Sequence, residues 1–277
     1  MPHVKTGQEN NQDIQLFFED HGQGQPVVLI HGFPLNGRSW ERQENALLDA
    51  GYRVITYDRR GFGQSSQPSS GYDYDTFTDD LDHLMTHLNL QDAILVGFSM
   101  GTGEVTRYLA RYGTERVSKA ILIGPIPPFL LKTDDNPEGV DQSVFEGIKA
   151  AIRQDRPRYL TEFFKNFYNA DVLLGSRVSQ EAMQMSWNVA ARASARATLA
   201  CVDTWLTDFR EDVKANTIPT LIIHGDSDRI LPIASTADRL KDLIPGSEYV
   251  VIKDGPHNIP WTHAEQVIQA MLAFMQK

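Results

Sequence analysis

Short apolar runs, bounded by turn residues and rich in β-branched side chains, occur in the first and last parts of the chain. Runs of this length and composition are typical of strands that are buried on both faces of a parallel sheet. They cover residues 27–30, 54–55, 93–96, 120–123, 221–223 and 249–252. Ile14, Leu16 and Phe18 instead alternate with polar neighbours, which predicts a half-exposed strand.

Between these strands the apolar positions recur every three to four residues, which is the spacing of one helix face. The pattern predicts helices over residues 77–88, 105–112, 233–244 and 264–275, the third with Pro232 at its first turn. Strands that alternate with helices indicate an α/β fold whose central sheet is mostly parallel and is flanked by helices.

The alternation stops between residues 125 and 216, where strand-like runs are absent and aromatic residues take helical spacing. This segment follows Gly124 and begins with Pro125-Ile126-Pro127-Pro128, which no regular element tolerates. We therefore predict one discontinuous core of residues 1–124 and 217–277, and a helical cap of residues 125–216 over the strand ends. Most cap aromatics are expected to pack helices together, and a few to line a cavity.

Composition and charge narrow the class of protein. The chain has 277 residues with 26 basic and 36 acidic side chains, a net charge of −10. This balance disfavours nucleic acid, which is normally bound by a basic face. No stretch approaches the ~18 uninterrupted apolar residues of a membrane span, and no secretory signal is expected. The single cysteine, Cys201, has no partner for an internal disulfide, so a cytoplasmic location is expected.

The motif with the most chemical content is Gly97-Phe98-Ser99-Met100-Gly101, which follows a predicted strand and precedes a predicted helix. In that context G-x-S-x-G holds a serine on a tight turn with its hydroxyl aimed away from the sheet. Glycine is needed on both sides because side chains there would collide with the strand or the helix. The helix N-terminus also favours negative charge at the serine. Ser99 is therefore the predicted nucleophile.

A serine hydroxyl needs a general base, and in this architecture an acid and then a histidine follow the serine in the chain. His257 lies on a loop between a predicted strand and the last helix and is the predicted base. The loop after residues 221–223 offers two acids, Asp226 and Asp228. Asp228 is favoured because Asp226 directly follows Gly225 and is placed to form a turn with its own backbone. An unperturbed histidine titrates near ~6.5, so activity should fall in acid.

The backbone amides of Met100 and Phe33 are the predicted oxyanion hole. Met100 directly follows the nucleophile, and Phe33 lies on the loop after residues 27–30. Gly32 lets this loop approach the site closely. Each such donor is typically worth roughly 2.7–4 kcal/mol in the transition state.

Other residues that could carry chemistry have simpler interpretations. His31 and His224 each end a predicted strand before a glycine, which indicates loop-shaping residues, and His263 opens the last helix in a surface or capping position. The G-x-G sequences at residues 61–63 and 101–103 lack the third glycine of a dinucleotide motif. A P-loop and metal-ligand spacing are also absent from the sequence, so neither a cofactor nor a metal is expected.

Together, these motifs resemble the α/β-hydrolase superfamily over nearly the whole chain. The segments that carry the resemblance are residues 31–34 (His-Gly-Phe-Pro), 58–65 (Asp-Arg-Arg-Gly-Phe-Gly-Gln-Ser), 97–101, 225–229 and 255–257. Residues 97–105 and 128–132 are similar to its cofactor-free bacterial haloperoxidase branch, also called the perhydrolase or aryl-esterase group. The chain departs from this branch at Thr102, where the branch usually has glycine.

The resemblance implies a triad of Ser99, Asp228 and His257, oxyanion donors at Phe33 and Met100, and no cofactor or metal. It implies hydrolysis of small carboxylic esters through an acyl-enzyme. It also implies that hydrogen peroxide releases the acyl group as a peracid, which then oxidises halide. Pro34, which follows Phe33, fits peracid formation because proline beside the oxyanion loop is associated with perhydrolysis in related esterases. A homo-oligomer, a trimer in relatives, is a further implication.

Two classes of alternative remain open at this point. A lactonase or a hydrolase of small amides or carbon–carbon bonds would use the same triad, and some proteins of this fold bind ligands without catalysis. Within the preferred interpretation, Phe129, Trp205 and Ile230 are expected to line a small apolar acyl pocket.

Overall fold

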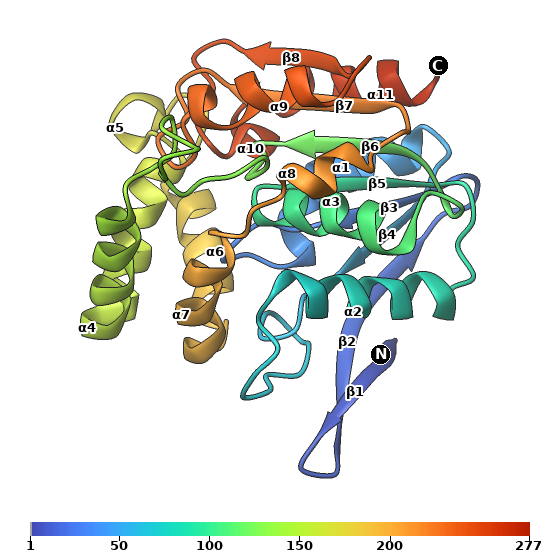
Figure 1. Cartoon of the computed structure of the whole chain (residues 1–277), viewed down its shortest axis with the longest axis horizontal. Helices are drawn as coiled ribbons and strands as arrows, with labels where there is room; N and C mark the ends of the chain where they lie inside the picture. The colour runs from blue at the N-terminus through green and yellow to red at the C-terminus, as the bar shows by residue number, and fades with distance from the viewer. Residues whose placement is uncertain (1) are drawn as a thin grey trace.

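A computed structural model of the chain describes residues 2–277, so Met1, where the predicted core begins, lies outside the described residues. Within the described range, the centre is an eight-stranded sheet with the order β1-β2-β4-β3-β5-β6-β7-β8 (Figure 1). β2 is antiparallel to both of its neighbours, and β4, β3, β5, β6, β7 and β8 run parallel to one another. The strands are β1 (His3–Glu9), β2 (Gln12–His21), β3 (Pro26–Ile30), β4 (Arg53–Tyr57), β5 (Ala93–Phe98), β6 (Val117–Ile123), β7 (Thr220–Gly225) and β8 (Glu248–Ile252).

The mostly parallel α/β architecture predicted from the apolar runs is confirmed, and the continuous runs have a direct explanation. In β3, Val28 and Ile30 face one hydrophobic core while Val27 and Leu29 face another, and all four are fully buried. A strand with helices on both sides needs apolar residues at every position. The sequence pattern does not predict β1, because this edge strand buries only Val4 and forms a hairpin with β2 that projects from the sheet (Figure 1).

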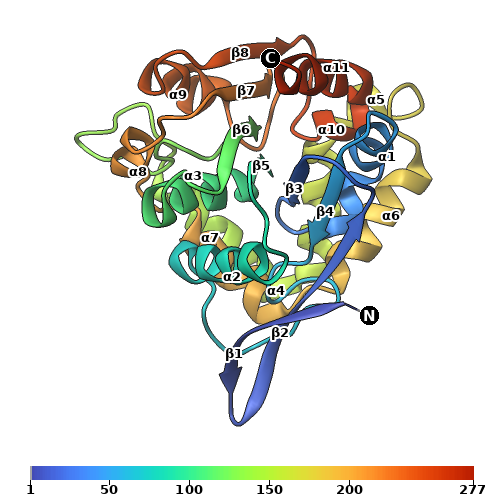
Figure 2. The same ribbon diagram turned by 90° about the vertical axis from the view of Figure 1, so that its right-hand side faces the viewer.

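Helices cover both faces of the sheet, with α1 and α11 on one face and α2, α3 and α9 on the other (Figure 2). These helices are α1 (Glu41–Asp49), α2 (Tyr74–His87), α3 (Met100–Tyr112), α9 (Ala237–Leu243) and α11 (Ala264–Met275); the short helices α10 (Ile259–Thr262), η1 (Gly37–Trp40) and η2 (Ile233–Ser235) lie in connections. Among residues 2–277, no helix has the length and apolar character needed to span a bilayer.

The helix predicted over residues 233–244 is wrong as a single element. Thr236 leaves the helical region with φ −130° and ψ −93°, so the segment divides into η2 and α9. The Thr236 hydroxyl donates to the carbonyl of Pro232 at 3.0 Å. Apolar spacing records only which side of a segment is buried, and it does not register such a local break.

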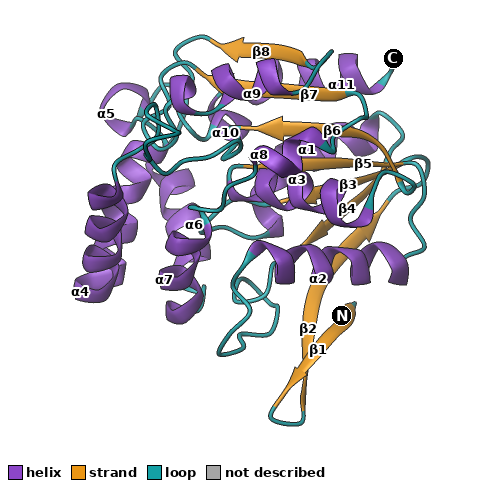
Figure 3. Ribbon diagram, viewed as in Figure 1, coloured by secondary structure: helices purple, strands orange, loops and turns teal. Residues whose placement is uncertain are grey.

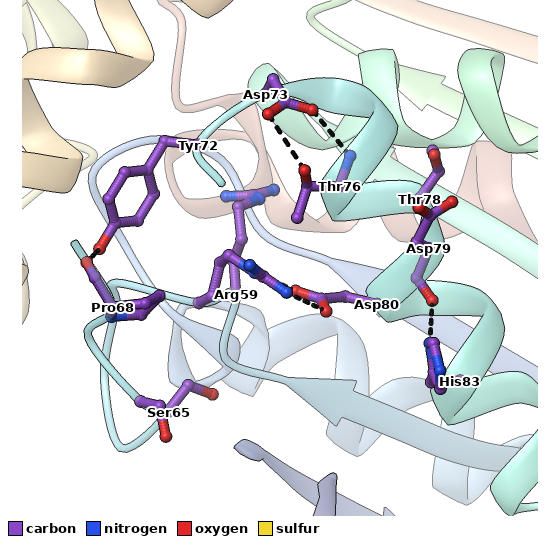
Figure 4. Close-up of polar contacts among 12 residues, drawn as sticks. Arg59, Ser65, Pro68, Tyr72, Asp73, Thr76, Thr78, Asp79, Asp80 and His83 are labelled. Carbon is purple, nitrogen blue, oxygen red and sulfur yellow. Dashed lines mark hydrogen bonds and ion pairs between the residues drawn. The ribbon is translucent and has the colours of Figure 1, made fainter. Parts of the chain in front are cut away.

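The start of α2 shows how the loop after β4 is held. Asp73 caps the helix, accepting hydrogen bonds from the backbone amide and the hydroxyl of Thr76 at 2.8 and 3.0 Å (Figure 4). Just before this cap, the Tyr72 hydroxyl donates to the carbonyl of Pro68 (Figure 4). These contacts fix the end of the loop on which Arg59 lies.

Between β6 and β7 the chain forms helices. The described residues of this segment form isolated β-bridges but no strand. The helices are α4 (Gln142–Phe167), α5 (Ala170–Leu173), α6 (Gln180–Ala191), α7 (Ala195–Thr204) and α8 (Arg210–Lys214). α4, α6 and α7 lie beyond the sheet edge toward which the arrowheads of β6 and β8 point (Figures 1 and 3). α4 is kinked at Asp155, whose side chain caps the second half by accepting from the Arg158 amide at 3.0 Å. The boundaries of the cap at residues 125 and 216 stay predictions.

Candidate active site

Ser99 lies on the turn between β5 and α3, with φ 53° and ψ −118°. Positive φ is unusual for a residue with a side chain and marks a strained turn. A Cβ atom at Gly97 would lie 2.6 Å from the carbonyl oxygen of Gly101, and one at Gly101 would collide with the carbonyl of Ile30. The motif's glycines are therefore required by direct backbone contact. The Ser99 amide donates to the carbonyl of Ile123 at 2.8 Å, which ties the turn to the sheet.

Ser99, His257 and Asp228 lie on the loops after β5, β8 and β7, and the carboxyl ends of these parallel strands meet at one edge of the sheet. His257 Nε2 is 2.8 Å from Ser99 Oγ, and His257 Nδ1 is 2.6 Å from Asp228 Oδ2. The serine is 6% and the histidine 1% exposed. The structure thus brings together the nucleophile, base and acid predicted from the sequence, in the hydrogen-bonded order that a catalytic triad requires.

Asp226, the other candidate acid, lies on the exposed part of the same loop. Its Oδ1 accepts the backbone amide of Asp254 at 2.7 Å and the hydroxyl of Ser227 at 3.1 Å. Its side chain therefore bonds the loop after β8 and not its own backbone, as its position after Gly225 had suggested. The structure brings Asp228 to His257 instead.

The Asp228 carboxylate is buried and fully hydrogen-bonded. Burial alone would raise its pKa, but the facing His257 ring and the hydrogen bonds from His257 and His224 hold the pKa well below the ordinary value. Its second oxygen, Oδ1, accepts the backbone amides of Ile230 and Leu231, each at 2.8 Å. The carboxylate is therefore ionised at neutral pH, as an acid that orients a histidine must be.

The loop that carries Phe33 packs directly on the nucleophile. A Cβ atom at Gly32 would lie 2.9 Å from the Phe98 ring and 3.0 Å from Ser99 Cβ, so only glycine permits this approach. Within residues 2–277, neither the Phe33 amide nor the Met100 amide makes a hydrogen bond. Both are available to an oxyanion, and their role as its donors stays a prediction.

A buried ion pair between Arg59 and Glu104 anchors this loop, and the two side chains are 1% and 0% exposed. The Arg59 guanidinium donates to the His31 carbonyl at 2.8 Å, and its backbone amide donates to His31 Nε2 at 3.0 Å. Burial, together with the Arg59 charge, lowers the pKa of His31 well below its ordinary value, so the neutral ring accepts this bond. The sequence pattern indicates no individual role for Arg59 or Glu104. The available signal was a glutamate on the buried helix that directly follows the nucleophile.

Thr102, where the sequence departs from the branch that it resembles, connects the nucleophile turn to the start of the helical segment. Its side chain is fully buried. The hydroxyl donates to the Ser99 carbonyl at 2.6 Å and accepts the Ile126 amide at 3.0 Å. Ile126 lines the cavity in front of Ser99. The threonine therefore fixes one wall of that cavity relative to the nucleophile.

Thr102→Val keeps the shape of the side chain and removes the hydroxyl. We expect the free energy of unfolding to fall by about 1–3 kcal/mol, because the buried Ile126 amide loses its acceptor. We also expect kcat on a short ester to fall about tenfold, equivalent to about 1.4 kcal/mol, with little change in KM. Urea unfolding and steady-state kinetics measure the two effects. Thr102→Ser, which keeps both bonds, is the control; wild-type kinetics and stability in the valine variant would contradict this role.

A cavity of about 290 Å³ lies in front of Ser99. It is about twice the size of a ~150 Å³ apolar cavity that binds benzene, which suits a small ester. Trp205 and Ile230, both expected in this lining, are part of it. The other lining residues are mostly apolar and include Leu130, Phe145, Ile148, Tyr159 and Phe163.

The prediction that Phe129 lines the cavity is wrong. This residue is not among those that line the cavity, and the Arg210 guanidinium lies over its ring at 5.0 Å. The next residue, Leu130, contributes to the lining instead. In an irregular segment no periodicity indicates which of two neighbours faces inward.

Charged side chains at the cavity are paired. Arg229 bonds Asp171 at 2.7 and 3.2 Å, and Glu162 bonds Lys165 at 2.8 Å. Arg229 and Glu162 are the charged members of the lining. The cavity therefore presents an apolar interior with a charge-balanced border to a substrate.

Two further histidines are buried near the active site. His263 is only 4% exposed, so the expected surface position is wrong. It is the N-cap residue of α11, but its side chain makes no capping bond, and its Nδ1 lies 2.9 Å from the Thr262 hydroxyl. The second, His224, lies against Asp228, with its Nε2 3.1 Å from Asp228 Oδ2. Among residues 2–277, no group of three or more His, Cys, Asp or Glu side chains could hold a metal ion.

Cys201 is fully buried in α7, and burial raises the pKa of its thiol to about 12. Since the thiolate is the reactive form, we expect almost no reaction of the native protein with a thiol-specific disulfide reagent at pH 8. Unfolding in urea should release one equivalent of reactive thiol. Rapid modification of the native protein would show that the α7 packing opens readily.

The geometry is accompanied by clear similarity to known proteins. Residues 25–264 match the family model described as "alpha/beta hydrolase fold". The chain belongs to the α/β-hydrolase family. It is 67% identical to a "putative non-heme chloroperoxidase" of Synechocystis sp., with all of both chains covered. It is 32% identical to a "bifunctional esterase/perhydrolase" of Acinetobacter calcoaceticus, covering 95% of this chain and 96% of that one.

Among solved structures, a bromoperoxidase from Bacillus anthracis superposes with a TM-score of 0.96. That structure is 48% identical, with 100% of this chain and 99% of that chain covered. Within the α/β hydrolases, the chain therefore belongs to the haloperoxidase branch, as its motifs indicated.

Proposed function

We propose that this α/β hydrolase cleaves small, neutral carboxylic esters through an acyl-enzyme on Ser99, and that hydrogen peroxide can replace water in releasing the acyl group. The observation that carries the proposal is the Ser99–His257–Asp228 hydrogen-bonded chain at the wall of an apolar cavity. The relatives named as chloroperoxidase and esterase/perhydrolase support the same chemistry.

In the first half of the reaction, Ser99 Oγ attacks the ester carbonyl while His257 Nε2 takes its proton. The Phe33 and Met100 amides bind the oxyanion. The bond from the acyl carbon to the alkoxy oxygen then breaks, and His257 passes its proton to the departing alcohol. Asp228 stabilises the imidazolium that exists between these two proton transfers.

In the second half, water or hydrogen peroxide attacks the acyl carbon while His257 takes its proton. The bond to Ser99 Oγ breaks and the serine regains a proton from His257. Water yields a carboxylic acid and peroxide yields a peracid. A free peracid oxidises halide to hypohalous acid and is itself reduced to the carboxylic acid, which accounts for haloperoxidase activity without a metal.

The apolar lining and the paired charges at its border support the proposal that the substrates are small and neutral. A carboxylate would enter this cavity without an unpaired cation to balance its charge. A free carboxylic acid would enter in its protonated form, and the same serine would be acylated with loss of water.

Two assays test the proposal. The wild-type protein is given p-nitrophenyl acetate, with release of nitrophenolate as the readout; separately it is given acetate and hydrogen peroxide, with peracetic acid as the readout. We expect both products. Ester cleavage without peracid would leave a plain esterase. Absence of both would favour a non-catalytic ligand-binding protein.

A further inference from the structure

His224 is a fully buried histidine that the mechanism above leaves without a role. It is the next-to-last residue of β7, and Asp228 lies on the loop that follows this strand. Its Nε2 lies 3.1 Å from Asp228 Oδ2 and 2.9 Å from the carbonyl oxygen of Leu231. Its Nδ1 is buried and has no hydrogen-bond partner within residues 2–277.

These contacts define the protonation of the ring. Both groups that face Nε2 are acceptors, so this nitrogen must carry a proton. A second proton on Nδ1 would be a buried donor without an acceptor, at a cost of roughly 1–3 kcal/mol. The arrangement therefore favours the neutral ring with its hydrogen on Nε2.

With this tautomer, Asp228 accepts three hydrogen bonds, from the amides of Ile230 and Leu231 at Oδ1 and from the His257 ring at Oδ2. The His224 Nε2–H, which also faces the Leu231 carbonyl, adds a polar contact of 3.1 Å to Oδ2. Rotation of the carboxylate would break bonds at both oxygens at once. Since the His224 ring approaches from the β7 side, it fixes the direction in which Oδ2 faces His257.

We propose that His224 is a positioning residue for the triad acid: its neutral Nε2–H holds Asp228 Oδ2 toward His257 Nδ1 and, through Leu231, closes the loop that carries the acid. This proposal rests on the hydrolase function proposed above. His224 does not line the substrate cavity, so its effect is on the chemical step and not on substrate binding.

The first experiment compares two variants. His224→Gln places an amide N–H near the position of the lost Nε2, whereas His224→Met fills similar space and donates nothing. We expect His224→Met to lower kcat about tenfold to thirtyfold at nearly constant KM, since each tenfold is about 1.4 kcal/mol. His224→Gln should retain at least a third of the wild-type kcat. Equal losses in both variants, or wild-type kcat in the methionine variant, would overturn the proposal.

A double-mutant cycle separates action through Asp228 from a general structural effect. In an Asp228→Asn background, His224→Met should cause less than a twofold further loss, because there is no carboxylate left to orient. A loss as large as in the wild-type background would show that His224 acts by another route. His263→Gln is the matched control, since this ring is also buried but contacts Thr262, and its kcat should stay within twofold of the wild type.

A measurement on the unmodified protein keeps the proposal testable if a variant does not fold. With ¹⁵N-labelled histidine, NMR should report His224 as the neutral Nε2–H tautomer in the resting protein. A proton on Nδ1 alone would overturn the proposal. This readout needs no catalysis, so it distinguishes failure of the positioning role from failure of the hydrolase function, which the ester assay of the wild type reports.

Discussion

Ser99→Ala should reduce kcat/KM for p-nitrophenyl acetate by about 10⁵-fold or more, because the acyl-enzyme route disappears with its nucleophile. The residual rate would come from the oxyanion donors and the cavity, which still bind the ester. Peracid formation from acetate and hydrogen peroxide should be lost in parallel, since both reactions pass through the same acylated oxygen. Stopped assays at high enzyme concentration measure both rates.

Ser186→Ala is the matched control for this variant. Ser186 is 6% exposed, like Ser99, but it lies on α6 and its hydroxyl bonds the Tyr168 hydroxyl at 2.7 Å. We expect this control to retain activity within about threefold, consistent with loss of one hydrogen bond that does not involve the triad. Equal ester cleavage by wild type and Ser99→Ala would show that the triad is not the catalyst.

Asp228→Asn should reduce kcat by about 10⁴-fold, the scale of loss when a triad carboxylate becomes an amide. The amide can donate to His257 Nδ1, which places the histidine proton on Nε2 and leaves no acceptor for the Ser99 hydroxyl. The loss should persist from pH 6 to pH 9, because raising the pH does not restore the tautomer. Steady-state kinetics across this range measure it.

Asp226→Asn is the corresponding control, because it changes the other acid that the sequence left open. Its carboxylate accepts the Asp254 amide on the loop surface and has no bond to His257. Activity should remain within about threefold of the wild type. If the two variants exchanged their effects, the acid of the triad would be Asp226.

Much of the fold and the reactive residues could be predicted from the sequence because both depend on short-range constraints. Continuous apolar runs mark strands buried on two faces, as in β3, and an edge strand such as β1 leaves no such mark because it buries a single valine. The serine turn needs glycine at fixed spacing for steric reasons, so Ser99 is visible as a motif. The order of serine, acid and histidine then limits the partners to a few loops.

Which residues of distant segments contact one another was decided only by the tertiary structure. The sequence left Asp226 and Asp228 open from the residues alone, and the folded loop presents one to His257 and the other to Asp254. It placed Phe129 in the pocket, where Leu130 lies instead.

No sequence pattern indicates that Thr102, His224 and Arg59 support the catalytic residues. In the structure, each of them contacts the triad or a segment next to it. The physical reason is that local patterns encode backbone geometry and burial. The direction of a hydrogen bond between residues far apart in the chain depends instead on how whole strands and loops pack.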